Sequence, residues 1–269
     1  MIEVGEWHLT RLPIAGTVNV RMDGYDNTTY GNAFADVYDD WYREISDIDA
    51  TVADLLEWAG AGPVLELGVG TGRLAVPLAE AGRTRELRVV GLDASSAMLA
   101  RLSERDVDRL VEAIEGDMIR DIPAGQFSLV LIAYNTLFNL TGDDQQAACF
   151  EAVARQLVSG GCFVVEAFVP DDPPQRGDAV SVRSIAVDRV VLSVTSHHPD
   201  SQSAEGQFVE FTEQGGVRLR PWAIRYANPV QLDRFAATAG LRLEQRWQQF
   251  GRIPFTDDSA RHVSVYRKE

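Results

Sequence analysis

Short apolar runs alternate with helical patterns between residues 64 and 169, and this rhythm predicts the centre of the fold. A continuous apolar run of about four to eight residues is typical of a strand buried on both faces, whereas apolar residues at spacings of three and four predict a helix. Strands that alternate with helices in this way indicate a parallel sheet covered by helices on both faces. The expected strands span residues 64–67, 87–92, 111–114, 127–133 and 162–169, with helices over 73–81, 95–105 and 143–158.

Helical patterns also flank this central region. From Gly31 onward, apolar residues at helical spacing predict one helix whose buried face holds Phe34, Val37, Tyr38 and Trp41. A second helix is expected over residues 46–58. Farther on, Asn228-Pro229 predicts a helix start, with Asn as cap and Pro at the first position. Strands at 241–247 and 262–266 then complete a doubly wound, mostly parallel, Rossmann-like sheet of seven strands in an α/β fold.

The rhythm changes at Pro170, where a turn-rich stretch is followed by four β-like runs at 180–187, 189–197, 206–213 and 217–224. Turn residues separate these runs, which predicts an antiparallel meander. We therefore expect residues 170–227 to form an inserted β cap that covers the site or joins copies of the chain as a homo-oligomer. The core domain would comprise residues 30–169 and 228–269. Residues 1–29 would be an N-terminal extension, and the first 21 are left out of the fold prediction.

Composition narrows the classes of partner. The chain carries 25 lysine and arginine residues against 40 acidic ones, a formal net charge of −15, so no basic footprint for a nucleic acid is present. Cys149 and Cys162 are too few for a disulfide framework and are expected as buried thiols. The sequence contains no signal-peptide core and no apolar run near the roughly 20 residues that cross a membrane. A cytoplasmic protein without membrane contact is expected.

The first central strand ends in a glycine-rich turn, Glu66-Leu67-Gly68-Val69-Gly70-Thr71-Gly72. Glycine lets the backbone approach a nucleotide cofactor closely. The dinucleotide fingerprint requires a small residue, Gly or Ala, at its sixth position, but counting from Gly68 that position is Arg73. The carboxylate of Glu66 would also repel a pyrophosphate but would stabilise a nearby cation. This turn therefore favours a cationic, phosphate-free nucleoside over NAD.

Acidic residues end the next two strands. Asp93 follows the glycines by about 20 positions, where a carboxylate can accept hydrogen bonds from two ribose hydroxyls. Asp117 is placed to accept a bond from an exocyclic adenine amine, and Met118 to pack on the ring. The carboxyl ends of these strands would converge on one crevice, as in other open α/β sheets.

The series VLELGVGTGRL, VVGLDASSAML, EGDM and FSLVLIAYNTLFNL resembles the successive motifs of the class I S-adenosylmethionine-dependent methyltransferases. The resemblance covers residues 64–169 densely. It implies S-adenosyl-L-methionine as cofactor and the following cofactor-binding residues: Tyr30, Tyr38, Glu66, Gly68, Gly70, Gly72, Arg73, Asp93, Ala94, Met98, Asp117, Met118 and Ala133.

The stretch from Tyr30 to Tyr42 is similar to that of actinobacterial small-molecule N-methyltransferases, among them those that finish lincosamide antibiotics. This resemblance implies Tyr30, Tyr38 and Phe138 as catalytic residues and a secondary amine, carried by an alkylproline joined to a thio-octose, as acceptor. Tyr38 and Phe138 fit core packing as well. No catalytic His or dyad stands out, which favours an amine acceptor over a hydroxyl.

Other functions stay open at this point. An aminosugar N-methyltransferase, a small-molecule O-methyltransferase and a cofactor-binding scaffold without catalysis share the same motifs. His197-His198 could suggest a metal site, but neighbouring residues on a strand point to opposite faces, so no metal is expected.

Overall fold

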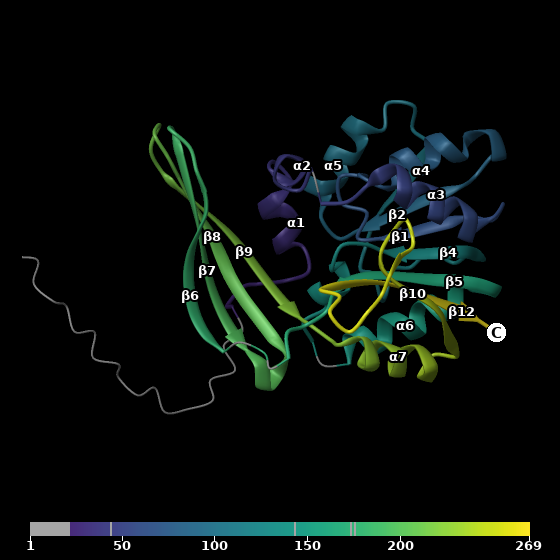
Figure 1. Ribbon diagram of the computed structural model, residues 1–269. Coiled ribbons are helices and arrows are strands. Elements are labelled where there is room, and N and C mark those ends of the chain that lie inside the picture. The colour runs from purple at the N-terminus through teal and green to yellow at the C-terminus, as the bar shows by residue number, and fades with distance from the viewer. Residues whose placement is uncertain (1–21, 44, 143, 173, 175) are drawn as a thin grey trace, which may run out of the picture.

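Two β-sheets stand side by side in the computed structural model, which describes residues 22–43, 45–142, 144–172, 174 and 176–269 (Figure 1). The residues left out of the fold prediction, 1–21, lie outside the described residues. The larger sheet runs in the order β11-β10-β12-β5-β4-β1-β2-β3, and the smaller one in the order β6-β7-β8-β9. The predicted α/β fold with an inserted antiparallel sheet is confirmed.

The large sheet is parallel through its centre. Its parallel strands are β1 (Val64–Leu67), β2 (Val89–Asp93), β3 (Val111–Glu115), β4 (Phe127–Ile132) and β5 (Leu157–Phe168). Antiparallel strands continue it through β12 (Arg261–Lys268), β10 (Leu241–Gln249) and a short eighth strand, β11 (Ile253–Pro254). The sequence predicted seven of these, because the two residues of β11 are too few to show a pattern.

Helices cover both faces of this sheet and create two separate hydrophobic cores. One core contains side chains of α3 (Ile48–Ala59), α4 (Ala75–Gly82), followed by the turn η1 (Arg83–Arg85), and α5 (Ser96–Arg105). The other contains side chains of α6 (Gln145–Gln156) and α7 (Pro229–Thr238). The predicted start of α7 is confirmed, since Asn228 and Gln231 form a reciprocal capping box ahead of Pro229.

The boundary between α6 and β5 differs from the prediction. We expected a helix to residue 158 and a strand from 162, but α6 ends at Gln156 and β5 begins at Leu157. Phe127 pairs with Leu157 and Leu129 with Cys162, so the intervening residues bulge out of the ladder. Gly160 has a positive φ of 77° there, and a Cβ on Gly161 would lie 3.0 Å from two backbone oxygens. The glycines therefore shape a bulge inside the strand rather than ending a helix.

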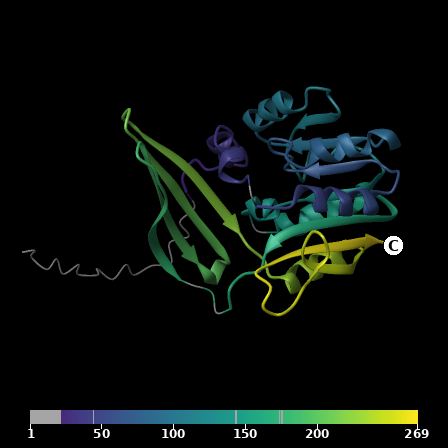
Figure 2. The same ribbon diagram turned by 45° about the horizontal axis from the view of Figure 1, so that its top comes forward.

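The single helix predicted from Gly31 is broken in two. The segments are α1 (Thr29–Phe34) and α2 (Tyr38–Trp41), separated where Val37 leaves the helical region at φ −120° and ψ −6°. Part of the predicted face survives, because the rings of Phe34 and Trp41 meet edge to face at 5.9 Å. Residues 22–43, called the N-terminal segment below, lie between the small sheet and the core domain (Figures 1 and 2).

The small sheet, called the cap below, is the predicted meander. Its strands are β6 (Gly177–Ile185), β7 (Arg189–His198), β8 (Ser203–Thr212) and β9 (Val217–Arg225), with the turn η3 (Pro199–Ser201) between β7 and β8. Its inner face packs on the N-terminal segment, where Phe208 meets Phe34 and Trp41 at ring distances of 5.9 and 5.4 Å.

One buried arginine joins the cap to the N-terminal segment. Arg220 on β9 is 1% exposed and donates to both carboxylate oxygens of Asp36, at 2.7 and 3.1 Å. It also donates to Glu210 on β8 at 2.9 Å and to the backbone oxygen of Ala33 at 2.5 Å. A buried guanidinium is stable only with such partners, so these elements are held together by one charge network.

Candidate cofactor and acceptor site

The glycine-rich turn after β1 forms the floor of the site. Gly68, Gly70 and Gly72 all have positive φ, at 71°, 56° and 75°. A Cβ on Gly68 would lie 2.2 Å from the Thr136 methyl group, so only glycine permits this approach. The turn is held to the neighbouring strand by the backbone N–H of Gly70, which donates to Asp93 Oδ2 at 2.8 Å.

Asp93 ends β2 and points into the crevice beside this turn. Its other oxygen accepts a bond from the backbone N–H of Ser95 at 2.8 Å. Burial raises the pKa of Asp93, and the two N–H donors partly oppose that effect. Each oxygen keeps a second lone pair, so the carboxylate can still accept bonds from a ligand's hydroxyls.

Asp117 follows β3 at the opposite end of the crevice. Although partial burial acts the other way, backbone N–H groups of Ile119 and Arg120 hold the pKa of Asp117 below its ordinary value. Its Oδ2 also accepts a bond from the side-chain amide of Asn27 at 3.2 Å. An ionised acceptor thus lies next to the thioether of Met118.

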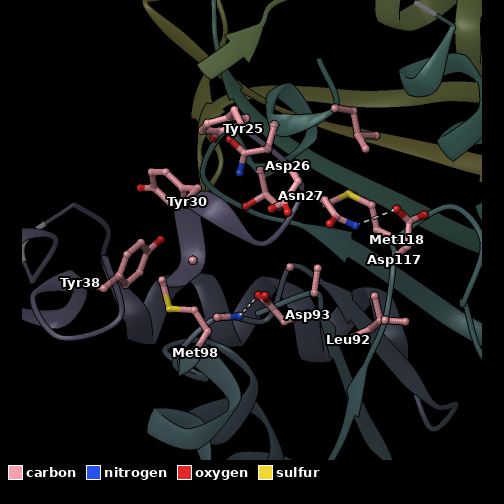
Figure 3. A pocket seen from close by; sticks show the side chains of 18 residues that line it. Tyr25, Asp26, Asn27, Tyr30, Tyr38, Leu92, Asp93, Met98, Asp117 and Met118 are labelled. Atoms are coloured by element: carbon pink, nitrogen blue, oxygen red, sulfur yellow. Dashed lines mark hydrogen bonds between the residues drawn. The ribbon is translucent and has the colours of Figure 1, made fainter. Parts of the chain in front are cut away.

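These groups surround one pocket (Figure 3). In the close-up, Asp93 and Met98 lie on one side, Tyr25, Asp26 and Asn27 on the other, and Tyr30 and Tyr38 close one end. The pocket encloses about 740 Å³ including its open mouth. It brings together these predicted site residues: Tyr30, Tyr38, Gly68, Gly70, Asp93, Ala94, Met98, Asp117 and Met118.

A buried carboxylate lies beneath the turn. Glu66 is 6% exposed, and its Oε2 has no hydrogen-bond partner among the described residues. Burial raises the pKa of Glu66 to about 8, even though the charge of nearby Arg73 acts to lower it. A buried carboxylate with an unpaired oxygen is a receptor for a cation.

The comparisons with known proteins agree with this geometry. Residues 64–161 match the family described as a methyltransferase domain. The solved structure of the CcbJ methyltransferase from Streptomyces caelestis is 38% identical, with a TM-score of 0.82, and the match covers 91% of this chain and 99% of that one. The chain belongs to the class I S-adenosylmethionine-dependent methyltransferases.

Two curated relatives extend the comparison. The cypemycin N-terminal methyltransferase from Streptomyces sp is 29% identical over 248 residues, which cover 87% of this chain and 98% of the relative. The dTDP-3-amino-3,6-dideoxy-alpha-D-glucopyranose N,N-dimethyltransferase from Streptomyces fradiae is 31% identical over 146 residues, about half of each protein. The second name describes methylation of nitrogen, and the first describes methylation at an N-terminus.

The residues of this methyltransferase fit S-adenosylmethionine. The unpaired Glu66 oxygen suits a ligand with an ammonium group, and the glycine cradle admits a ligand's main chain close to the backbone. Asp93 and Asp117 are acceptors at two ends of one pocket, suited to ribose hydroxyls and an adenine amine. The described residues that line the pocket include no lysine or arginine that could pair with a pyrophosphate.

Five predicted site residues, Phe138 among them, do not line the pocket. Gly72 packs instead, since a Cβ there would lie 3.0 Å from Leu102 and Val76. Arg73 donates to Ser46 Oγ at 2.5 Å. Ala133 and Glu66 are buried.

Phe138, the third predicted catalytic residue, does not line the pocket. Its ring is fully buried in the hydrophobic core and meets Phe168 edge to face at 5.0 Å. The same short helix, η2 (Thr136–Asn139), does supply pocket-lining residues, because Thr136 and Asn139 both contact the cavity. Tyr30, expected ahead of the helix, lies inside α1.

Sequence reasoning missed the wall formed by Tyr25, Asp26 and Asn27. These residues lie in the stretch that we assigned to an N-terminal extension, where no hydrophobic period was visible. Asp26 folds the stretch locally by accepting bonds from Thr28 and Thr29. A local turn of this kind leaves no signal about which distant surface it will cover.

A second, more polar cavity adjoins the first and is the larger of the two, since it encloses about 1480 Å³ including its open mouth. The cap contributes His198, Ser203 and Glu205 to it, whereas the core domain contributes Thr141 and Gln145. The two cavities share one wall, made of Tyr25, Asp26, Asn27, Asp117, Asn139 and Leu140.

The remaining predictions concern histidines and cysteines. His197 and His198 diverge, since His197 Nε2 lies 3.1 Å from the Tyr226 hydroxyl and His198 Nε2 lies 3.2 Å from Ser196 Oγ. Within the described part of the chain no group of three or more potential metal ligands comes together. Cys149 and Cys162 are buried free thiols, as predicted. None of the described helices combines the length and apolar character that a membrane span requires.

Proposed function

We propose that this methyltransferase methylates an amine nitrogen of a small natural product. The observation that carries the proposal is the lack of a strong base among the described pocket-lining residues. Burial raises the pKa of both Tyr30 and Tyr38, so their hydroxyls stay protonated at neutral pH. The pKa of Asp117 is lowered, and although burial raises the pKa of Asp93, backbone donors hold both oxygens of that carboxylate. A hydroxyl acceptor would need a base, whereas a neutral amine is already nucleophilic.

The residues would act mainly by alignment. When bound, S-adenosylmethionine supplies a methyl group that passes to the acceptor nitrogen as its bond to sulfur breaks. Glu66 would hold the ammonium end, Asp93 the ribose and Asp117 the adenine amine. The protonated hydroxyls of Tyr30 and Tyr38 can orient polar groups at the reacting end, and burial of these rings excludes water. The proton that the amine loses on methylation passes to solvent.

Within this class we propose the secondary amine of a lincosamide precursor as acceptor. Support comes from the sequence resemblance around Tyr30 and Tyr38, both of which line the pocket. Phe138, the third residue of that resemblance, gives no support, because it is buried in the core. The alternative is an aminosugar, in line with the name of the dimethyltransferase relative.

The test is a substrate screen by mass spectrometry with the purified chain and S-adenosylmethionine. Amines should gain one methyl group, and their hydroxyl analogues should not. Methylation of the hydroxyl compounds alone would overturn the proposal. Calorimetry with S-adenosylhomocysteine and NAD serves as control: binding of the former without any turnover would favour a scaffold that does not catalyse.

We also propose that the cap joins copies of the chain. Phe208 and Arg220 point to the N-terminal segment, so the alternate positions of the same strands point outward. Cross-strand pairing aligns these outward positions into one apolar face, which leaves the following side chains 38–68% exposed: Val180, Val182, Val194, Phe211, Val217 and Leu219. A contiguous apolar face of this kind is typical of an interface.

A further inference from the structure

An aromatic wall stands at the end of the cofactor pocket that Tyr30 and Tyr38 close, away from the adenine end proposed for Asp117 (Figure 3). Two further tyrosines extend this end. The Tyr42 hydroxyl lies 3.5 Å from that of Tyr30. The Tyr42 ring lies 4.8 Å from the ring of Tyr38 and 5.5 Å from that of Tyr134. All four side chains are only partly buried, so they present an accessible wall to an acceptor that approaches the methyl group from this end.

One cation of the cap lies against this wall. The guanidinium of Arg183, on β6, lies 4.4 Å from the ring centre of Trp41 and 4.8 Å from that of Phe208. It lies 5.6 Å from the ring centre of Tyr42, the residue that contacts Tyr30. A guanidinium is attracted to the faces of aromatic rings, so these contacts hold Arg183 beside the wall.

The strand departs from its regular ladder at this residue. Val182 pairs with Leu192 and Ser184 pairs with Val191, so Arg183 is the one extra residue of a β-bulge. A bulge bends its strand, and bulges are common beside active sites. The position of Arg183 is therefore a specific feature of the cap rather than a repeat of the meander.

Arg183 also differs from its neighbours in the cap because it has no anionic partner. Arg189, Arg218 and Arg220 pair with carboxylates at 3.3, 2.7 and 2.7 Å. The guanidinium of Arg183 makes no ion pair or hydrogen bond with any residue that the structure describes. Aromatic rings stabilise its charge but supply no oxygen for its five N–H donors. In a chain of net charge −15, these donors are left open to a ligand.

The charge of Arg183 reaches the tyrosine wall. Burial raises the pKa of Tyr134, and the neighbouring Tyr42 and Glu166 act in the same direction. The positive charges of Arg183 and Arg73 act to lower that pKa. An anion bound at Arg183 would therefore lie close to the reacting end of the pocket.

We infer that Arg183 binds a carboxylate of the acceptor, so that the amine at Tyr30 and Tyr38 belongs to a molecule with an anionic group at its other end. The inference rests on the proposed N-methylation. The planar fork of a guanidinium matches a carboxylate with two parallel N–H···O bonds. An exposed ion pair alone contributes little, but rings that hold the guanidinium in place reduce the entropy lost on binding. Arg183 is thus a positioning residue that selects the charge of the acceptor.

Three variants separate this role from simple packing. Arg183→Gln removes the charge but keeps a planar group over Trp41. Arg183→Lys keeps the charge without the fork. Arg176→Gln is the matched control, because it removes one positive charge from a side chain that is 62% exposed just before β6. Thermal melting of each variant checks that it folds.

The experiment uses the full chain saturated with S-adenosylhomocysteine. Calorimetry measures the Kd of 4-aminobutanoate, 6-aminohexanoate and 8-aminooctanoate and of the amide of each, a series that varies the distance from amine to carboxylate. We expect the acid of the fitting length to bind about fivefold or more tightly than its amide. Arg183→Gln should abolish this difference, Arg183→Lys should keep part of it, and Arg176→Gln should leave it unchanged. With S-adenosylmethionine, the KM values for methylation should show the same ratios of acid to amide.

Equal binding of acid and amide at every length would overturn the inference, and so would a preference for acids that survives in Arg183→Gln. Equal weakening of acids and amides in that variant would make Arg183 a packing residue. None of these results contradicts the N-methylation proposal, which methylation of the amines tests separately. Methylation of 6-hydroxyhexanoate on its hydroxyl, but not of 6-aminohexanoate, would overturn N-methylation and leave carboxylate binding by Arg183 standing.

Discussion

At the scale of single residues, we expect Glu66 to make cofactor binding depend on pH. Burial raises the pKa of this carboxyl to about 8, so it is mostly protonated at pH 6 and ionised at pH 9. A bound ammonium favours the ionised form, and binding below pH 8 must therefore expel a proton. We expect the Kd for S-adenosylhomocysteine, measured by calorimetry, to fall as the pH rises from 6 to 8. Glu66→Gln should flatten this profile and weaken binding at pH 8 about tenfold or more.

The same substitution should stabilise the protein without ligand. The folded-state pKa of Glu66 lies above its ordinary value of 4.5, so the folded chain holds the proton more tightly than the unfolded chain does. This contribution to stability is fully present below pH 4.5 and is lost as the pH rises through 8. Glu66→Gln should raise the melting temperature at pH 8. A lower melting temperature of Glu66→Gln would contradict this expectation and show that the Glu66 carboxylate stabilises the folded chain.

Asp93 offers a second test at this scale. Asp93→Ala should weaken binding of S-adenosylhomocysteine at least tenfold, because it removes a charge-assisted bond worth roughly 1.5–3 kcal/mol. Asp106 is a matched control: it also accepts two backbone N–H bonds, from Leu110 and Val111, but lies outside the pocket. Asp106→Ala should cost stability and leave affinity unchanged. Equal affinity in both variants would count against Asp93 as the ribose contact.

At the scale of elements, a strained turn after β4 depends on Glu166. Tyr134 and Asn135 have positive φ, 44° and 63°, which non-glycine residues rarely adopt. The buried Glu166 carboxylate accepts the Tyr134 N–H at 2.9 Å, and its backbone oxygen accepts the Asn135 N–H at 3.0 Å. These bonds fix the turn that leads into η2.

Glu166→Ala leaves the Tyr134 N–H unpaired. We therefore expect the free energy of unfolding, measured by urea titration, to fall by about 1–3 kcal/mol. Because η2 lines the pocket, kcat should fall as well. Glu166→Gln keeps an acceptor oxygen and should restore most of the stability and most of kcat. If Gln behaved like Ala, the negative charge and not the hydrogen bond would be the important property.

The contact between the cap and the N-terminal segment depends on Arg220. Arg220→Met removes the buried cation that Asp36 and Glu210 share and leaves them only the more exposed Arg218 and Arg189. Removal of one partner of a buried pair costs about 3–5 kcal/mol. Because Asp36 lies next to α1, which bears Tyr30, cofactor affinity should fall too. Arg218 also pairs with Asp36, at 2.7 Å, but is 55% exposed, and Arg218→Met should cost at most about 1 kcal/mol. Similar losses in the two variants would show that burial adds nothing to the Arg220 pair.

The sequence predicted regular elements well and long-range contacts poorly. Strands such as β4 can be predicted because they are runs of apolar residues. Asn228-Pro229 predicts a helix start because a capping residue is followed by proline. Gly160-Gly161 misled the prediction, since glycines serve a bulge as readily as a helix end. The glycine turn, Asp93 and Asp117 were found because each follows a strand. Tyr25 and Asp26 were not, because their role depends on packing across the chain, and Phe138 could not be distinguished from a core residue by spacing.

At the scale of the whole molecule, the outward face of the cap should determine the oligomeric state. The chain has a net charge of −15, so most surfaces of two copies repel, whereas the apolar cap face does not. Light scattering at micromolar concentration should show an oligomer. Val182→Lys combined with Leu219→Lys should convert it to a monomer with an unchanged melting profile of the core. A monomeric unmodified chain would refute the interface.

The cap is one continuous insertion between β5 and α7, and recombination could therefore exchange it between related genes as a single block. Arg220 limits that freedom. Its partner Asp36 is encoded more than 180 positions earlier, in the N-terminal segment that also carries Tyr30 and Tyr38. A transplanted cap would arrive without its matching carboxylate unless both segments travelled together. Lineages that change acceptor by changing the cap should therefore show paired replacements at these two positions.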